Sequence, residues 1–181
     1  DKTISNAIGV FQQSLLGCIE GINDLGVGNG CDISNADGTI FAEVKNKHNT
    51  MNSSSAEATF QKLQAVADSH PYATCYLVQI IAKNSIDTLW EGSFNHKYYS
   101  HPRVRIISGD RFYALLTGIP NAFQQLCEAI PRATQDYLNS IANTTVAGTT
   151  NVSVYSQLSN NAHNNGRTLL EQVMADNFST Y

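Results

Sequence analysis

The sequence predicts a single α/β domain with a mixed central sheet flanked by helices. A length of 181 residues is enough for one sizeable hydrophobic core. A composition of 42% hydrophobic and 14% charged residues is typical of a globular protein. Helix-period and strand-period segments follow in the order helix, strand, strand, helix, strand, strand, and this order favours a sheet with parallel and antiparallel neighbours.

The first half of the chain contains two helices around a hairpin. Apolar side chains at helical spacing predict an amphipathic helix over residues 3–20. Two strands then flank the turn at residues 35–38, where Gly38 accepts the positive φ that hairpin turns demand. A polar loop over residues 46–55 is expected to lead into a helix over 56–69.

The second half begins with the strand expected at the centre of the sheet. Residues 72–82 are rich in β-branched and aromatic side chains, which favour strands. Further strands are predicted at 103–108 and, more weakly, 88–90, and a helix at 109–116. The stretch around His96 and His101 is interpreted as a solvated loop, with contact between these histidines and DNA as the alternative. The remaining expectations are one or two helices over 120–142, a strand or hairpin over 144–158 and a helix over 166–177.

Composition restricts the location of the protein. No run of about 18 apolar residues occurs, which argues against a membrane span. The four cysteines form no Cys-x-x-Cys pair and lie in apolar stretches, so we expect buried, reduced thiols in a cytoplasmic protein. No basic-then-apolar leader is seen, and the first residue, Asp1, is compatible with a natural N-terminus that extends further.

The net charge of −4 does not by itself favour a polyanionic partner. Its distribution is uneven, because the segment from Lys45 to Lys62 carries three lysines and one glutamate. Binding to a nucleic acid depends on local neutralisation of phosphates rather than on the total charge. The charge therefore permits a nucleic-acid partner without indicating one.

The hairpin carries the most informative residues of the chain. Asp32 lies on its first strand, and Glu43 and Lys45 share one face of its second strand because side chains alternate along a strand. Pairing of the two strands can bring these three side chains together at one sheet edge. Two carboxylates beside an ammonium suit a divalent metal and an attacking water, so the pattern predicts phosphodiester hydrolysis.

This pattern resembles the PD-(D/E)XK nuclease superfamily, with Asp32 followed by Glu43-Val44-Lys45 in a helix–hairpin–helix–strand context. The string FAEVKNKHNTMNSS at residues 41–54 is similar to the signature block of type II restriction endonucleases that cut GGNCC or GGWCC sites. A second block, ISGDRFY at residues 107–113, is also similar to that family. The resemblance covers about residues 5–118.

The resemblance implies a domain organisation, a metal and partners. It implies a single nuclease domain over 1–181, with a catalytic core at about 3–118 and a helical and irregular part at 119–181. It implies Mg²⁺ held by Asp32, Glu43 and the carbonyl of Val44, with Lys45 beside the attacking water. The implied partners are double-stranded DNA, a second copy of the chain in a homodimer, and a methyltransferase of the same system without a stable complex.

Two departures from the superfamily pattern stand out. Cys31 occupies the position before the aspartate, where the superfamily has proline. Many relatives also place an acid on the first helix to support the metal site, whereas this chain offers Gln12 and Gln13 there. These two glutamines are therefore possible accessory residues.

The polar segment after Lys45 is the predicted DNA-contacting region, because it leaves the catalytic strand directly. Basic, amide and hydroxyl side chains can bind phosphates or read base edges. The candidates are Asn46, Lys47, His48, Asn49, Asn52, Ser53 and Ser54, with Arg103, Arg105 and Arg111 as second-line candidates for guanine.

Three alternatives stay open at this point. The hairpin could carry only an exposed Glu–Lys surface pair, which contributes little to stability. The protein could be another nuclease of the superfamily, acting in repair or junction cleavage. It could also be a catalytically silent DNA-binding module, although Asp32, Glu43 and Lys45 are all present.

Overall fold

The computed structural model of the chain describes residues 2–26, 30–130, 133, 160–167 and 172. The chain divides into two compact units, Asp1–Pro120 and Asn121–Tyr181. Eleven elements are described in the first unit: α1 (Lys2–Gly17), β1 (Ile22–Asp24), β2 (Ile33–Asn35), β3 (Ile40–Lys47), α2 (Ser53–Ser69), β4 (Thr74–Ile81), β5 (Asp87–Leu89), β6 (Gly92–Phe94), β7 (Lys97–Tyr99), β8 (Val104–Ser108) and α3 (Gly109–Thr117).

A six-stranded mixed sheet forms the centre of the first unit, in the order β1-β2-β3-β4-β8-β5. The inner strands β3, β4 and β8 are parallel, whereas β1, β2 and β5 pair antiparallel with their neighbours. This confirms the predicted α/β fold class with a mixed sheet flanked by helices. β4 is buried along almost its whole length, as expected for a central strand.

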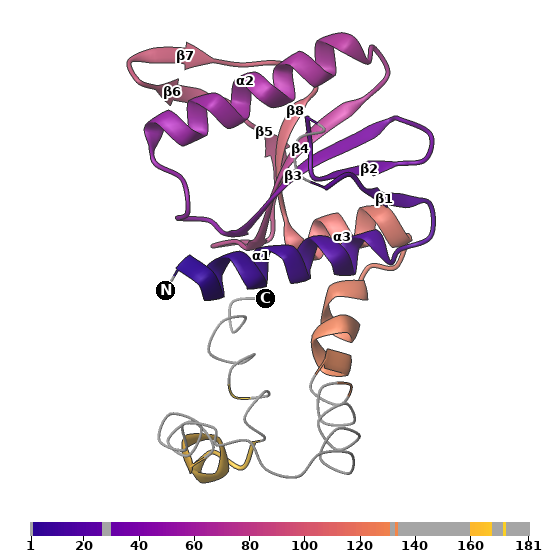
Figure 1. Ribbon diagram of the computed structural model, residues 1–181, viewed down its shortest axis with the longest axis vertical. Coiled ribbons are helices and arrows are strands. Elements are labelled where there is room, and N and C mark those ends of the chain that lie inside the picture. Colours follow the sequence, from indigo (N-terminus) through magenta and orange to yellow (C-terminus); the bar gives the residue numbers. More distant parts are fainter. Residues whose placement is uncertain (1, 27–29, 131–132, 134–159, 168–171, 173–181) are drawn as a thin grey trace. The chain divides into compact units, whose positions relative to one another are not determined.

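Helices cover both faces of the sheet (Figure 1). α2 lies on one face, and α1 and α3 lie on the other. Under α2, Phe60 and Leu63 are fully buried and belong to one apolar cluster with Leu77 of β4. On the opposite face, Tyr76 of β4 packs against Phe112 of α3, with ring centroids 5.9 Å apart. The alternation along β4 thus supplies both layers of the core.

The β2–β3 hairpin turns as the sequence predicts. Gly38 has a φ of +66°, which L side chains rarely adopt, so glycine suits this position. The side-chain oxygen of Asn35 accepts hydrogen bonds from the backbone N–H groups of Thr39 and Ile40, both at 2.9 Å. These bonds fix the end of the turn and hence the point at which β3 begins.

Two predictions about the connecting segments are wrong. The expected polar loop at residues 46–55 is shorter, because β3 continues to Lys47 and α2 already begins at Ser53. The stretch around His96 is not a loop but the turn of a two-stranded sheet formed by β6 and β7. Asn95 and His96 both have positive φ, at 47° and 66°, so this hairpin turn is built without glycine.

The second unit is described only in part. Residues 122–130 and 160–164 are helical, and the first of these segments lies within the predicted helical stretch at 120–142. The strand or hairpin predicted at 144–158 lies outside the described residues, as does most of the helix predicted at 166–177.

The cysteine prediction is correct for two of the four residues. Cys31 and Cys75 are buried free thiols in the core beneath α2, whereas Cys127 is half-buried and Cys18 is exposed. Cys18 lies just after the end of α1, where its side chain has left the apolar stripe of that helix.

Within the part of the chain that is described, none of the helices combines the length and the apolar character needed to cross a bilayer.

Candidate active site

Asp32 and Glu43 lie close together, with Asp32 just before β2 and Glu43 within β3. β2 pairs antiparallel with β3 through Ile33 and Ala42, and Asp32 is the residue immediately before β2. Asp32 donates its backbone N–H to the carbonyl oxygen of Ala42 at 2.9 Å. Its carboxylate Oδ2 accepts the backbone N–H of Val44 at 2.8 Å. The charges of Glu43, Lys45 and Lys62 also act on the pKa of Asp32, so the predicted juxtaposition of the two carboxylates is present.

Glu43 is held by two lysines, one on each carboxylate oxygen. Lys45 Nζ donates to Oε1 at 2.8 Å, and Lys62 Nζ donates to Oε2 at 2.5 Å. Glu43 itself is only 7% exposed. This burial contradicts the alternative of an exposed surface pair, because one carboxylate with two ammonium partners is enclosed by the fold.

The two carboxyl groups respond differently to this environment. Burial raises the pKa of Asp32, and the hydrogen bond from Val44 only partly opposes that effect. Burial also acts to raise the pKa of Glu43, but the hydrogen bonds and charges of Lys45 and Lys62 outweigh it and hold the pKa below its usual range. For Lys62, burial acts to lower the pKa, and the contact with Glu43 more than compensates, so its pKa is raised.

The group lies on a face of the sheet rather than at a sheet edge, which corrects the sequence-based expectation. β3 is an inner strand between β2 and β4. Phe41, two residues before Glu43, contacts the ring of His70 at the end of α2, with centroids 4.6 Å apart. The face that carries Glu43 and Lys45 is therefore the one that α2 covers.

Lys62 is the site residue that the sequence reasoning missed. It lies on α2, 19 residues after Glu43, and entered the sequence analysis only as a contribution to local charge. One signal was present, because Lys62 follows the buried Thr59 by three residues and precedes the partly buried Val66 by four. That spacing places it beside the stripe of α2 that packs on the sheet.

The two candidate accessory glutamines differ in their contacts. Gln13 Nε2 donates to Asp24 Oδ1 at 2.6 Å and to the backbone carbonyl of Asp32 at 3.4 Å, so it touches the backbone of the site rather than a carboxylate. The Oε1 atom of Gln12 is buried and accepts no hydrogen bond from the described residues.

The donor set suits a hard divalent cation. Asp32 and Glu43 offer carboxylate oxygens for coordination. Mg²⁺ is commonly bound through one or two carboxylates together with water and substrate phosphate. The described residues contain no group of three or more His, Cys, Asp or Glu side chains arranged to hold a metal. A cation at this site would thus depend on backbone carbonyl, water or phosphate oxygens for its remaining ligands.

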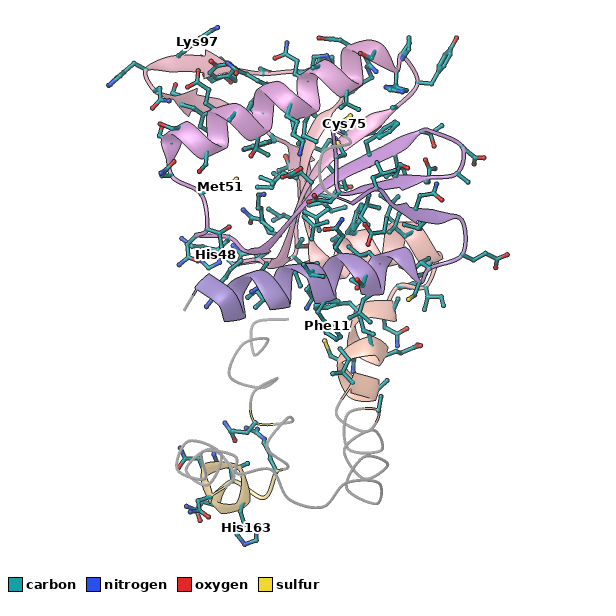
Figure 2. The ribbon with its side chains drawn as sticks, viewed as in Figure 1. Phe11, His48, Met51, Cys75, Lys97 and His163 are labelled. Atoms are coloured by element: carbon teal, nitrogen blue, oxygen red, sulfur yellow. The ribbon has the colours of Figure 1, made fainter. Side chains whose placement is uncertain are left out.

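The residues predicted to contact DNA are placed around the end of β3 and the start of α2. Figure 2 shows His48 where β3 ends and Met51 in the connection to α2. Lys47 and Asn49 are exposed, whereas His48 is half-buried and contacts the carbonyl oxygen of Ile81 through Nδ1 at 3.3 Å. Asn46 lies within β3 and is half-buried.

The residues at the start of α2 have structural partners. Asn52 is the N-cap, and its Oδ1 accepts the backbone N–H of Ser55 at 2.9 Å. The hydroxyl of Ser53 accepts the backbone N–H of Asn95 at 2.9 Å, and Ser54 accepts the side-chain amide of Asn95 at 3.4 Å. The β6–β7 hairpin is therefore fastened to the N-terminus of α2.

The three arginines also have protein partners. Arg103 donates to the carbonyl oxygens of His70 and Ala73, and Arg105 forms an ion pair with Asp87 at 2.7 Å. Arg111 Nε donates to the hydroxyl of Ser85 at 3.0 Å. None of the three guanidinium groups contacts the carboxylates of Asp32 or Glu43 among the described interactions.

A mixed α/β sheet with two carboxylates and a lysine gathered around one inner strand fits the nuclease core that the sequence predicts. The chain belongs to the Eco47II restriction endonuclease family, whose model matches residues 1–139. It is thus a type II restriction endonuclease, an enzyme class that cleaves DNA at specific sites, and the class predicted from the sequence is confirmed.

Two relatives show the extent of the similarity. The chain is 38% identical to the type II restriction enzyme Sau96I of Staphylococcus aureus over 186 residues, covering 98% of this chain and 70% of that protein. It is 36% identical to the type II restriction enzyme Eco47II of Escherichia coli over 147 residues, covering 76% of this chain and 62% of that protein. No solved structure matches the chain significantly.

Proposed function

We propose that this endonuclease cleaves double-stranded DNA in a Mg²⁺-dependent reaction at a short, palindromic, GC-rich site of the GGNCC or GGWCC kind, leaving 5′-phosphate ends. The observation that carries this proposal is the gathering of Asp32, Glu43 and Lys45 around the middle of β3. The carboxylate of Asp32 accepts a 2.8 Å hydrogen bond from the backbone of Val44, which lies between Glu43 and Lys45 on β3. Lys45 contacts Glu43 at 2.8 Å.

The residues of the site divide the work in this proposal. Asp32, Glu43 and the carbonyl of Val44 would hold the cation. Bound Mg²⁺ would supply positive charge beside the scissile phosphate and make water more acidic. Lys45 orients the attacking water and stabilises the negative charge that develops on the phosphate. A bond forms between the water oxygen and phosphorus while the bond between phosphorus and O3′ breaks. The attacking water gives up one proton to solvent and O3′ takes one from solvent, so the products carry a 5′-phosphate and a 3′-hydroxyl.

The proposed DNA contacts lie mainly in the segment that follows Lys45. Lys47 and Asn49 are exposed and follow Lys45 by two and four residues. They therefore suit contacts to phosphates and base edges close to the scissile bond. Asn52 uses Oδ1 for the cap of α2, which leaves its amide N–H groups for DNA. Asn46, His48, Ser53 and Ser54 remain candidates, and so do Arg103, Arg105 and Arg111, whose present partners would compete with DNA.

The partners and location follow from the proposed reaction. A palindromic site is matched by a homodimer whose two-fold axis coincides with that of the DNA. Sedimentation of the protein with and without a palindromic duplex tests the dimer. A methyltransferase would protect the same site without a stable complex, and the DNA substrate implies a cytoplasmic location.

Sequencing of fragment ends tests the proposed specificity. The protein is incubated with a plasmid of known sequence and Mg²⁺, with an EDTA control. Discrete fragments whose ends all map to one GGNCC-type sequence support the proposal. Fragments with ends at unrelated sequences, or cleavage that persists in EDTA, would overturn it.

A further inference from the structure

Lys62 occupies a position that the proposed reaction does not yet use. Its ammonium binds Oε2 of Glu43 at 2.5 Å, while Lys45 binds Oε1 at 2.8 Å. We propose that Lys62 is a positioning residue of the active site, which fixes the orientation of the Glu43 carboxylate for cation binding. This inference rests on the proposed role of Glu43 as a cation ligand.

The geometry argues for an orienting contact. A carboxylate with one ammonium on each oxygen cannot rotate about its terminal bond without breaking a charge-assisted hydrogen bond. Lys45 is on the same strand as Glu43 and fixes one oxygen, whereas Lys62 approaches from a different element and fixes the other. The two lysines together fix the plane of the Glu43 carboxylate. With Lys45 alone, the carboxylate could still rotate.

The burial of the three side chains separates this contact from an ordinary surface ion pair. The side chain of Glu43 is 10% exposed, compared with 29% for Lys45 and 39% for Lys62. An exposed pair contributes little to stability. Here the acceptor is largely enclosed while the donors are more exposed, so the carboxylate faces mainly its two lysine partners.

The helix that carries Lys62 is firmly anchored. Phe60 and Leu63, on either side of Lys62 in the sequence, are both fully buried. Phe60 packs against Trp90, with ring centroids 5.3 Å apart, and the N-terminus of α2 is capped by Asn52. A side chain that orients a metal ligand is most effective on such a rigid element, because backbone movement would otherwise change the position of the ligand.

Groups that hydrogen-bond a metal ligand commonly contribute 10- to 100-fold to metal affinity or activity, as an order of magnitude. An opposing effect is simple repulsion between the Lys62 ammonium and an incoming divalent cation. A purely repulsive lysine would make its removal strengthen cation binding. A positioning lysine would make its removal weaken cation binding, so the two roles predict changes of opposite sign.

The test compares Lys62→Met, which removes the ammonium but retains the length of the side chain, with Lys62→Arg, which retains a cationic donor. Lys83→Met is the matched control, because Lys83 is an exposed lysine in the turn after β4. Two quantities are measured against Mg²⁺ concentration: the rise in Tm of the protein without DNA, which reports cation binding, and the single-turnover cleavage rate. DNA binding in EDTA is measured in parallel.

We expect Lys62→Met to need roughly 10- to 100-fold more Mg²⁺ for the same rise in Tm and for half-maximal cleavage. DNA binding in EDTA stays within about twofold, since charge loss at one partly buried lysine removes at most one phosphate contact. Lys62→Arg recovers much of the loss, and Lys83→Met matches the wild type. An unchanged or lower Mg²⁺ requirement in Lys62→Met would overturn the inference.

Two further variants keep the test decisive. If Lys62→Met does not fold, Lys62→Gln takes its place with the same supporting and contradicting outcomes. Lys45→Ala separates the two proposals: cleavage at the wild-type rate by that variant would refute the proposed active site itself. An inactive Lys45→Ala beside a Lys62→Met with normal Mg²⁺ dependence would refute only the role of Lys62.

Discussion

The backbone N–H of Val44 donates a 2.8 Å hydrogen bond to Oδ2 of Asp32. This bond joins the residue before β2 to the strand position between Glu43 and Lys45. It orients the carboxylate of Asp32 toward the strand that carries the other two side chains. The geometry of the site therefore depends on the hairpin backbone as well as on the side chains.

Substitution of Asp32 by Asn is expected to raise the Tm of the metal-free protein at pH 7 while abolishing cleavage. Burial raises the pKa of Asp32 above its ordinary value, so the folded state takes up the proton at a higher pH than the unfolded state. Ionised Asp32 therefore costs stability at neutral pH, and the neutral amide removes that cost while still accepting the Val44 N–H.

Thermal unfolding across a pH series measures this effect. The stability difference between Asp32→Asn and the wild type should shrink as the pH falls through the raised pKa of Asp32 toward 3.8. If Asp32→Asn melts at or below the wild-type temperature at pH 7, the buried, ionised carboxylate of Asp32 does not destabilise the fold.

Substitution of Glu43 by Gln is expected to lower the Tm at pH 7. The pKa of Glu43 lies below its ordinary value of 4.5 because the two lysines outweigh the effect of burial. Its contribution to stability is thus present above pH 4.5 and is lost as the pH falls through the lowered folded-state pKa. The difference in Tm between Glu43→Gln and the wild type should close in that acidic range, and equal melting temperatures at pH 7 would contradict the account.

Substitution of Asn52 by Ser separates capping from DNA contact. Serine is also a good N-cap, so the free energy of unfolding should change little, whereas Asn52→Ala should lose about 0.5–2 kcal/mol. If the amide N–H groups contact DNA, Asn52→Ser lowers DNA affinity by roughly 2- to 10-fold, equivalent to about 0.5–1.5 kcal/mol. Equal DNA affinity, measured by fluorescence anisotropy in EDTA, would leave Asn52 with the capping role alone.

Substitution of Phe60 by Ala is expected to cost about 3–5 kcal/mol in the free energy of unfolding, because it opens a cavity beneath α2. Phe60 is fully buried and contacts Trp90, Phe94 and Tyr99. Urea unfolding followed by the fluorescence of Trp90, the single tryptophan, measures the change. Tyr72→Ala is the control, since Tyr72 is 91% exposed and its loss should stay within about 0.5 kcal/mol; a similar small cost for Phe60→Ala would contradict the packing described.

The local features of the fold were predictable because they depend on neighbours in the sequence. Strand alternation set Glu43 and Lys45 on one face, and Gly38 marked the turn that brings Asp32 back to them. The β6–β7 hairpin was missed because its turn uses Asn95 and His96 rather than glycine. Its position depends on hydrogen bonds to Ser53 and Ser54, some 40 residues earlier, which no local pattern reveals.

The sequence predicted the site residues of the hairpin but not Lys62, which lies on α2. The contact between Lys62 and Glu43 requires α2 to lie across β3 at one particular angle and depth. Packing of Phe60 and Leu63 in the core sets that placement, and such packing is a property of the whole fold. The polar segment before α2 was read as a longer loop for a similar reason, because pairing with β4 extends β3 to Lys47.

The most direct test of the account is the single-turnover cleavage rate of Lys45→Ala on a duplex with one GGNCC-type site at saturating Mg²⁺. DNA binding is checked in EDTA to show that the variant still engages its substrate. The account predicts a rate lower than that of the wild type by roughly 10²- to 10⁴-fold, with DNA affinity nearly unchanged. Cleavage at the wild-type rate would contradict the assignment of Asp32, Glu43 and Lys45 as the active site.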